Sequence, residues 1–157
     1  MPDKNKAVLP SAWFATDPFR VRYQESDQMG VVYHANYLSW FESGRTEMLR
    51  RLGFDYRSLE EQGVLLPVTE ANLQFKSPAR YDDLIAVHAR LAVFSPLRVV
   101  YEYEVRRIRQ DGNEDSPAGQ PLVTGSTSHV WVNRDFKPVR LDRALPELYG
   151  AIAGALR

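Results

Sequence analysis

Residues 31–53 of this 157-residue chain read VVYHANYLSWFESGRTEMLRRLG. Aromatic, apolar and small residues recur there every three or four positions, which is typical of one face of an α-helix: Tyr37, Trp40, Phe41, Gly44, Met48 and Leu52. We expect this helix to start between His34 and Asn36 and to stop at Gly53, because glycine suits the position that ends a helix. Gly44 inside the helix costs about 1 kcal/mol relative to alanine, so we expect a closely packed neighbour on that face.

After Leu65 the apolar residues alternate with polar ones, which is the pattern of β-strands. The strands expected from this alternation cover residues 69–75, 85–93, 99–105 and 122–132. A short strand is also expected from Phe19 to Tyr23, a polar loop at 111–120, and a short C-terminal helix at 145–156. The order predicts an α+β fold in which four consecutive antiparallel strands form a meander that covers the long helix.

The length of the chain is typical of one domain. A chain of 157 residues can close a single hydrophobic core without metals or disulfides. Residues 1–17 show no sustained periodicity, so we expect an N-terminal tail attached through Trp13 and Phe14. Residues 18–157 are expected to form the single folded domain.

The composition narrows the partners and the location. Twenty basic and twenty acidic side chains leave no net charge, so neither nucleic acid nor a membrane surface is a predicted partner. The chain has no cysteine, which excludes disulfides and thiolate catalysis and is consistent with a reducing compartment. No N-terminal apolar segment and no apolar run of about eighteen residues is present. We therefore expect a cytoplasmic protein without integral membrane association.

Reactive side chains, including two carboxylates and a histidine, are concentrated in residues 25–36, directly before the long helix. Free amides and the positive dipole end at a helix N-terminus can stabilise an oxyanion, which forms when a thioester carbonyl is attacked. Aspartates are ordinarily ionised at neutral pH, so Asp27 can attack such a carbonyl or activate water. On residue type alone, an aspartate before a helix is more often a turn or capping residue.

Other chemistries fit the sequence less well. Glu25, Asp27 and His34 match no metal-ligand spacing, so we predict no metal. Glu42 and Glu47 on the helix are expected to form ion pairs or to face solvent. The segment GSTSH at 125–129 lacks the second glycine of a nucleophile elbow, which excludes that type of serine hydrolase.

Two strings resemble the signature of the 4-hydroxybenzoyl-CoA thioesterase family, and most closely its Tol-Pal-associated acyl-CoA thioesterase branch. They are VRYQESDQMGVVYHANYLSWFESGRTEML at 21–49 and PARYDD at 78–83. The resemblance covers residues 18–135. It implies a hotdog fold, in which a curved antiparallel sheet of about five strands wraps around one long central helix, with a short C-terminal helix in addition. It also implies hydrolysis of acyl-CoA to a free acid and coenzyme A without a cofactor, by a homodimer that often pairs into a homotetramer.

The resemblance also implies roles for individual residues. Asp27 matches the catalytic aspartate of the family, which acts as nucleophile or general base, and Gly30 matches the glycine of the loop that follows. His34 falls where the family supplies a helix-terminal backbone amide to the thioester oxygen. Tyr33 and Asn36 match positions that shape the substrate pocket and hold the helix start.

The coenzyme A contacts match the family less closely. Relatives often carry a basic or glycine-containing turn where this chain has FSPLR at 94–98, so Arg98 is the remaining basic candidate for substrate binding. An acyl carrier protein is therefore kept as an alternative carrier. The alternative to thioester hydrolysis is a hotdog protein that binds an acyl group or acts as a scaffold, and a dehydratase ranks last. The sequence predicts no acyl-chain preference.

Overall fold

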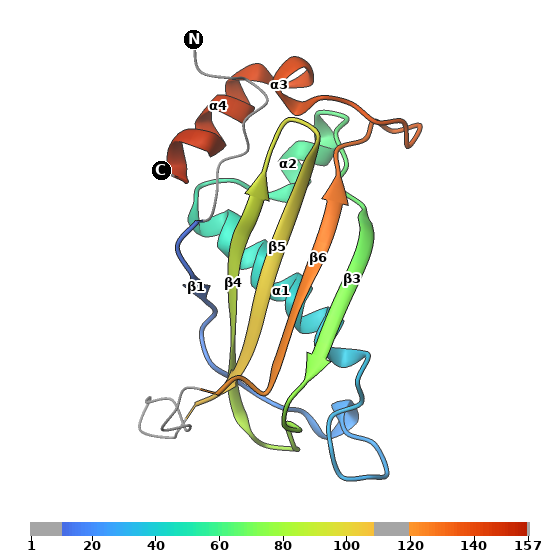
Figure 1. Ribbon diagram of the computed structural model, residues 1–157, viewed down its shortest axis with the longest axis vertical. Coiled ribbons are helices and arrows are strands. Elements are labelled where there is room, and N and C mark those ends of the chain that lie inside the picture. Colours follow the sequence, from blue (N-terminus) through green and yellow to red (C-terminus); the bar gives the residue numbers. More distant parts are fainter. Residues whose placement is uncertain (1–10, 109–119, 157) are drawn as a thin grey trace.

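The structure is a computed structural model that describes residues 11–108 and 120–156 (Figure 1). The predicted polar loop at 111–120, apart from its last residue, and the first ten residues of the predicted tail lie outside the described residues. None of the helices in the described ranges is both long and apolar enough to cross a lipid bilayer.

Helix α1 (Asn36–Arg51) begins and ends as the sequence predicts. It buries the predicted aromatic face, including Tyr37, Trp40 and Phe41. Gly53 follows with φ +94°, in the left-handed region that suits glycine after a helix. A Cβ atom added at Gly44 would lie 2.8 Å from Cγ1 of Val87. The predicted close neighbour of Gly44 is therefore confirmed, and the backbone of α1 lies directly against the sheet.

The sheet is antiparallel and six-stranded, and α1 packs across one of its faces (Figure 1). Its strands are β1 (Phe14–Ala15), β2 (Phe19–Arg20), β3 (Val68–Phe75), β4 (Leu84–Phe94), β5 (Arg98–Arg107) and β6 (Val123–Val130). The four long strands lie where alternation predicts them. The strand expected from Phe19 to Tyr23 is shorter than predicted, because Tyr23–Glu25 forms a 3-10 turn.

The predicted four-strand meander is wrong at one strand. β4, β5 and β6 are neighbours in chain order, but β3 pairs with β6 instead of β4, with Leu73 opposite Gly125. The segment 76–83 therefore crosses from one edge of the sheet toward the other. Alternation identifies a strand, whereas its neighbour depends on packing between distant segments, and consecutive strands pair only about two-thirds of the time.

Strand β3 forms an exposed edge of the sheet. Val68 at its start is 47% exposed and Phe75 at its end is 56% exposed. Within residues 11–108 and 120–156, its only strand partner is β6. An uncovered edge of this length presents free backbone groups and apolar side chains to any strand that can pair with it.

Residues 11–16, at the start of the described part of the chain, are attached to β4. Ser11 and Thr16 donate backbone hydrogen bonds to Leu91 and Val87 of β4, at 2.9 Å each, and Phe14 between them packs against the core. The predicted domain boundary at residue 18 stays a prediction.

Two helical segments follow the last strand. Helix α4 (Pro146–Ala155) confirms the predicted C-terminal helix at 145–156, with Tyr149 stacked on Phe94 at 5.2 Å between ring centroids. The short helix before it, α3 (Leu141–Ala144), lies outside the predicted range. A further short helix, α2 (Tyr56–Glu61), was not predicted from the sequence.

Candidate active site

A tight turn, residues 27–30, precedes α1 and carries Asp27. The amide of Gly30 donates to the carbonyl of Asp27 at 3.0 Å, and the amide of Asp27 donates to the carbonyl of Val31 at 2.9 Å. Gly30 has φ +77°, a conformation that glycine adopts without strain. A bridge between Ser26 and Val32 closes the loop around the turn. The turn therefore has a defined geometry rather than that of a loose connection.

The carboxylate of Asp27 uses only one of its oxygens within the protein. Oδ1 accepts a hydrogen bond from the amide of Met29 at 2.9 Å. Oδ2 makes no hydrogen bond to any residue that the structure describes. Asp27 is partly exposed. One oxygen thus holds the turn, while the other is open to water or a ligand.

Residues 78–83, the second segment that resembles the family signature, form hydrogen bonds to this turn and to the residues that follow it. The amide of Val32 donates to the carbonyl of Ala79 at 2.9 Å, and the amide of Ala79 donates to the hydroxyl of Tyr37 at 3.2 Å. The guanidinium of Arg80 donates to the carbonyl of Gly30 at 3.3 Å. The two strings that carry the family resemblance are therefore in contact around Asp27.

The two residues directly before α1 have backbone amides without a partner in the described chain. The amides of Asn36, Tyr37 and Leu38 donate to carbonyls three residues earlier, at 3.0, 3.3 and 3.2 Å. Those of His34 and Ala35 donate to nothing within residues 11–108 and 120–156. Free amides at the positive end of a helix are suited to an oxyanion.

Asp27 and His34 line the same pocket, which has a volume of about 260 Å³ and is also lined by Tyr37 from α1. We call it the Asp27 pocket. Phe75 from the end of β3 contributes an apolar wall, and the adjacent Lys76 is the only lysine or arginine among the lining residues that the structure describes. The aromatic ring of Phe75 lies edge-on to the His34 imidazole, with 6.4 Å between centroids.

The other predicted site residues lie at different distances from this pocket. Tyr33 is half-exposed beside His34, with 4.5 Å between ring centroids. Asn36 holds the helix start, because its Nδ2 donates to the carbonyl of Glu25 at 2.8 Å. Arg98 lies far away. It pairs with Val130, at the end of the sheet opposite Phe75, which pairs with Val123, so about 23 Å of strand separates the two ends.

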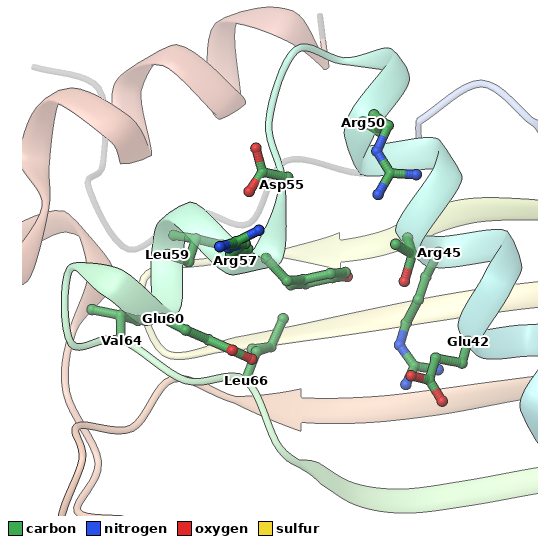
Figure 2. A pocket seen from close by; sticks show the side chains of 11 residues that line it. Glu42, Arg45, Arg50, Asp55, Arg57, Leu59, Glu60, Val64 and Leu66 are labelled. Carbon is green, nitrogen blue, oxygen red and sulfur yellow. The ribbon is translucent and has the colours of Figure 1, made fainter.

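A larger pocket, of about 570 Å³, lies between α1, α2 and the start of β3 (Figure 2). Its lining carries charges of both signs together with apolar side chains: Glu42, Arg45, Arg50, Asp55, Arg57 and Glu60, with Leu59, Val64 and Leu66. We call it the α1–α2 pocket. It shares no lining residue with the Asp27 pocket.

A buried chain of hydrogen bonds borders the α1–α2 pocket. Arg45 Nη1 lies 3.5 Å from the hydroxyl of Tyr103, which is 2.6 Å from Thr127 Oγ1. Thr127 is 2.8 Å from Nε2 of His129, and Nδ1 of His129 is 3.2 Å from the carbonyl of Leu66. Burial lowers the pKa of His129 to about 4, so its imidazole is neutral near pH 7. The buried imidazole contributes to packing.

Residues 21–148 match the sequence profile of the Thioesterase-like superfamily. The chain belongs to this superfamily. It is 39% identical over 132 residues to YneP of Bacillus subtilis, which is assigned as an acyl-CoA thioesterase, covering 83% of this chain and 89% of YneP. It is 33% identical over 88 residues to the acyl-CoA thioester hydrolase YbgC of Escherichia coli, covering 56% of this chain and 66% of YbgC.

A solved structure supports the same assignment. The DHNA-CoA thioesterase from Staphylococcus aureus superposes with a TM-score of 0.79 at 36% identity, covering 90% of this chain and 89% of that one. The fold of this superfamily member is therefore the predicted α+β hotdog fold, and its predicted class, a thioester hydrolase, is confirmed.

One residue important for the site geometry of this thioesterase was missed. Glu25, considered from the sequence only as a metal ligand, is 6% exposed. Its carboxylate accepts from Nε1 of Trp40 at 2.7 Å and from the amide of Arg22 at 2.8 Å. Its carbonyl accepts from the amide of Tyr33 at 2.9 Å, in addition to Asn36. Glu25 therefore ties the loop that carries Asp27 to α1, and nothing in its sequence position indicates that an indole fifteen residues later would reach it.

No group of three or more histidine, aspartate or glutamate side chains that could hold a metal ion occurs in the described ranges. The Glu25 carboxylate is instead occupied by Trp40 and Arg22.

Proposed function

We propose that this thioesterase hydrolyses acyl-CoA to a free carboxylic acid and coenzyme A in the Asp27 pocket. The observation that carries this proposal is that Asp27 lines the same pocket as His34. Within the described residues, Oδ2 of Asp27 has no hydrogen bond and the amide of His34, just before the positive end of α1, donates to nothing. Attack on a thioester needs both a nucleophile or base and a donor for the oxyanion. The lining of the pocket supplies one of each.

The reaction then proceeds by one of two orders. As a nucleophile, Asp27 attacks the thioester carbonyl, the carbon–sulfur bond breaks, and water hydrolyses the resulting mixed anhydride. As a general base, Asp27 takes a proton from water that attacks the same carbon, and the proton passes to the departing thiolate. In both orders the amide of His34 donates to the carbonyl oxygen as it gains charge, and one such donor is typically worth roughly 3 kcal/mol.

The other predicted residues position these groups. Gly30 permits the turn that presents Asp27, and Asn36 anchors the start of α1 through Glu25. Tyr33 packs its ring beside that of His34, which lines the pocket. We assign the oxyanion contact to the backbone of His34, because its imidazole is exposed and lies against aromatic rings.

A homodimer formed through β3 is part of the proposal. The exposed edge of β3 and its apolar ends, Val68 and Phe75, favour pairing with a second copy, and closed two-fold symmetry is the commonest arrangement of homodimers. An antiparallel pair about a two-fold axis brings the Arg98 end of the second sheet to the Asp27 end of the first. Arg98 of a second copy is thus our candidate for contact with coenzyme A.

Other expectations from the resemblance stay predictions: the homotetramer, the Tol-Pal-associated branch, the cytoplasmic location and acyl carrier protein as an alternative carrier.

The test is release of free thiol from short, long and aromatic acyl-CoA substrates by the native protein and by Asp27→Asn. We expect kcat to fall about 10²-fold to 10⁴-fold in the variant, with an unchanged fold. Asp17→Asn is the matched control, because the Asp17 side chain is 94% exposed and its ion pair to Arg51 is long, at 3.8 Å. Equal activity in the native and Asp27→Asn proteins would refute the role of Asp27. No turnover of any substrate by the native protein would favour the acyl-binding or scaffold alternative.

A further inference from the structure

The α1–α2 pocket contains an arginine with few partners. Arg45 reaches into it from α1 and is half-buried (Figure 2). In the part of the chain that the structure describes, its side chain has a single hydrogen bond, the 3.5 Å contact to Tyr103, and no ion pair. A guanidinium carries five N–H donors. Most of the donors of Arg45 are therefore available to a ligand in the pocket.

The pocket also offers a hydroxyl and an apolar wall. Tyr56 lines it, and its hydroxyl lies 2.7 Å from the hydroxyl of Tyr101. Burial raises the pKa of both tyrosines, so both hydroxyls keep their protons. Leu59, Val64 and Leu66 supply apolar surface beside these polar groups. A ligand with an apolar body and an oxygen at its end matches this lining.

The charges of the lining favour a neutral ligand. Its three guanidiniums, from arginines 45, 50 and 57, are balanced by three carboxylates, from Glu42, Asp55 and Glu60. Because these charges cancel, the pocket has no net electrostatic attraction for a polyanion. The phosphate-bearing end of coenzyme A is therefore a poor occupant. A hydroxyl suits the pocket better, since it can accept from Arg45 and donate to Glu42.

The positions of the two pockets along β3 connect them in a dimer. The Asp27 pocket includes Phe75, the last residue of β3, whereas the α1–α2 pocket includes Leu66, two residues before its start. Both pockets are also lined by α1, so they open on the same face of the sheet. Antiparallel pairing of two β3 strands about a two-fold axis places the end of one strand beside the start of the other. The Asp27 pocket of one copy then adjoins the α1–α2 pocket of its partner.

Resting on the proposed function, we propose that the α1–α2 pocket of one copy receives the far end of the acyl group whose thioester is cleaved at Asp27 of the other copy. Arg45, assisted by Tyr56, selects acyl groups that end in a neutral oxygen, such as a hydroxyl. Arg45 is thus a specificity-determining residue that acts across the dimer, and each site is incomplete in a single chain.

The first test compares matched acyl-CoA substrates of equal chain length that end in a methyl, a hydroxyl or a carboxylate group. We expect kcat/KM of the native protein to favour the hydroxyl over the methyl about 10-fold to 100-fold, as for a hydrogen bond to a charged group. Arg45→Met should abolish this preference while kcat/KM for the methyl-ended substrate is retained. The carboxylate-ended substrate should gain less than the hydroxyl, because a carboxylate can accept from Arg45 but cannot donate to Glu42, whereas a hydroxyl does both.

Two further variants serve as a control and as a second test of the role of the pocket. Arg51→Met removes an arginine of the same helix that does not line the α1–α2 pocket, so the preference should persist. Tyr56→Phe keeps the shape of the pocket and should reduce the preference by a smaller factor than Arg45→Met. It also keeps the inference testable if Arg45→Met does not fold.

The second test asks whether Arg45 acts across the dimer. Asp27→Asn and Arg45→Met chains carrying different tags are co-expressed, and the mixed dimer is purified. If each site is shared between two copies, one of the two sites in the mixed dimer combines the native Asp27 of one chain with the native Arg45 of the other. The mixed dimer should then recover the hydroxyl preference that both parents lack. If both residues serve the same chain, no site is complete and the preference stays absent, which overturns the inference.

The two proposals fail in different ways. Turnover of methyl-ended acyl-CoA without any terminal preference, or a preference that survives Arg45→Met, rejects the selection by Arg45 and leaves the proposed function intact. No turnover of any acyl-CoA by the native protein rejects the proposed function itself.

Discussion

Polar side chains in the interior of this protein differ from Asp27, in the turn at residues 27–30, in how completely they are hydrogen-bonded. The carboxylate of Glu25 and the imidazole of His129 are buried, and each has a partner on both of its polar atoms. The carboxylate of Asp27 is partly exposed, and one of its oxygens has no partner among the residues that the structure describes. A buried polar group without partners is costly. The difference teaches that the interior groups serve stability, whereas the turn leaves bonding capacity unused for a ligand.

The largest effect that tests this comparison is expected at His129. Its pKa is about 4 in the folded protein and near 6.5 in an unfolded chain. Between these values the unfolded chain binds a proton that the folded protein does not, so stability falls as the pH drops through this window. The loss amounts to about 3 kcal/mol at most. Urea unfolding at pH 7 and pH 4 should show that the native protein loses this much more than His129→Gln does. A parallel decline in both proteins would contradict the interior role of the neutral imidazole.

An intermediate effect is expected for Glu25→Gln. The neutral amide weakens the hydrogen bonds from Trp40 and Arg22 and places an NH₂ group among donors, so we expect the free energy of unfolding to drop by about 2 kcal/mol. Chemical denaturation measures this change. Asp27→Asn is the matched control two residues away, and it should change stability by less than about 0.5 kcal/mol. The comparison fails if Asp27→Asn destabilises the protein more than Glu25→Gln.

The smallest effect on stability is expected for Gly30→Ala. The left-handed conformation at φ +77° costs alanine about 1 kcal/mol, and among the described residues the new Cβ would meet only Arg80 Nη1, at 3.9 Å. Gly53→Ala is the control, since Gly53 has φ +94° and no atom of the described chain lies within 4 Å of an added Cβ. Both variants should lose similar stability in thermal unfolding. Thioester hydrolysis should fall in Gly30→Ala alone, because only this turn presents Asp27, and an equal effect in both would argue against that role.

Local features of the sequence predicted the local parts of the fold. The bounds of α1 follow from its apolar spacing and from Gly53, which are properties of neighbouring residues. The pairing of β3 with β6 could not be read in the same way, because it depends on contacts between segments far apart in the chain. Helix α2 has six residues, too few for a periodic pattern, although Asp55 caps it by accepting from the amide of Ser58 at 2.7 Å.

The site was predictable to the extent that its residues are close in sequence. Asp27 and His34 line one pocket, as a short motif before a helix allows. The anchoring of Glu25 by Trp40 needed the three-dimensional structure, because the indole reaches it only after α1 has packed. Arg98 lies at the opposite end of the sheet in the same chain. The proposed role of Arg98 in the site of a second copy depends on how two copies pair, which a single sequence does not indicate.

The crossing of segment 76–83 also bears on the order in which the protein folds. Strands β4, β5 and β6 are joined in chain order, so their contacts are comparatively local, whereas β3 must close a much longer loop to reach β6. Contacts between distant segments carry a larger loop-closure cost and slow folding. Phe75, which walls the Asp27 pocket, directly precedes this late connection, and Ala79, which supports the pocket, lies within it. We therefore expect partly folded chains to contain the three-stranded sheet but no competent pocket.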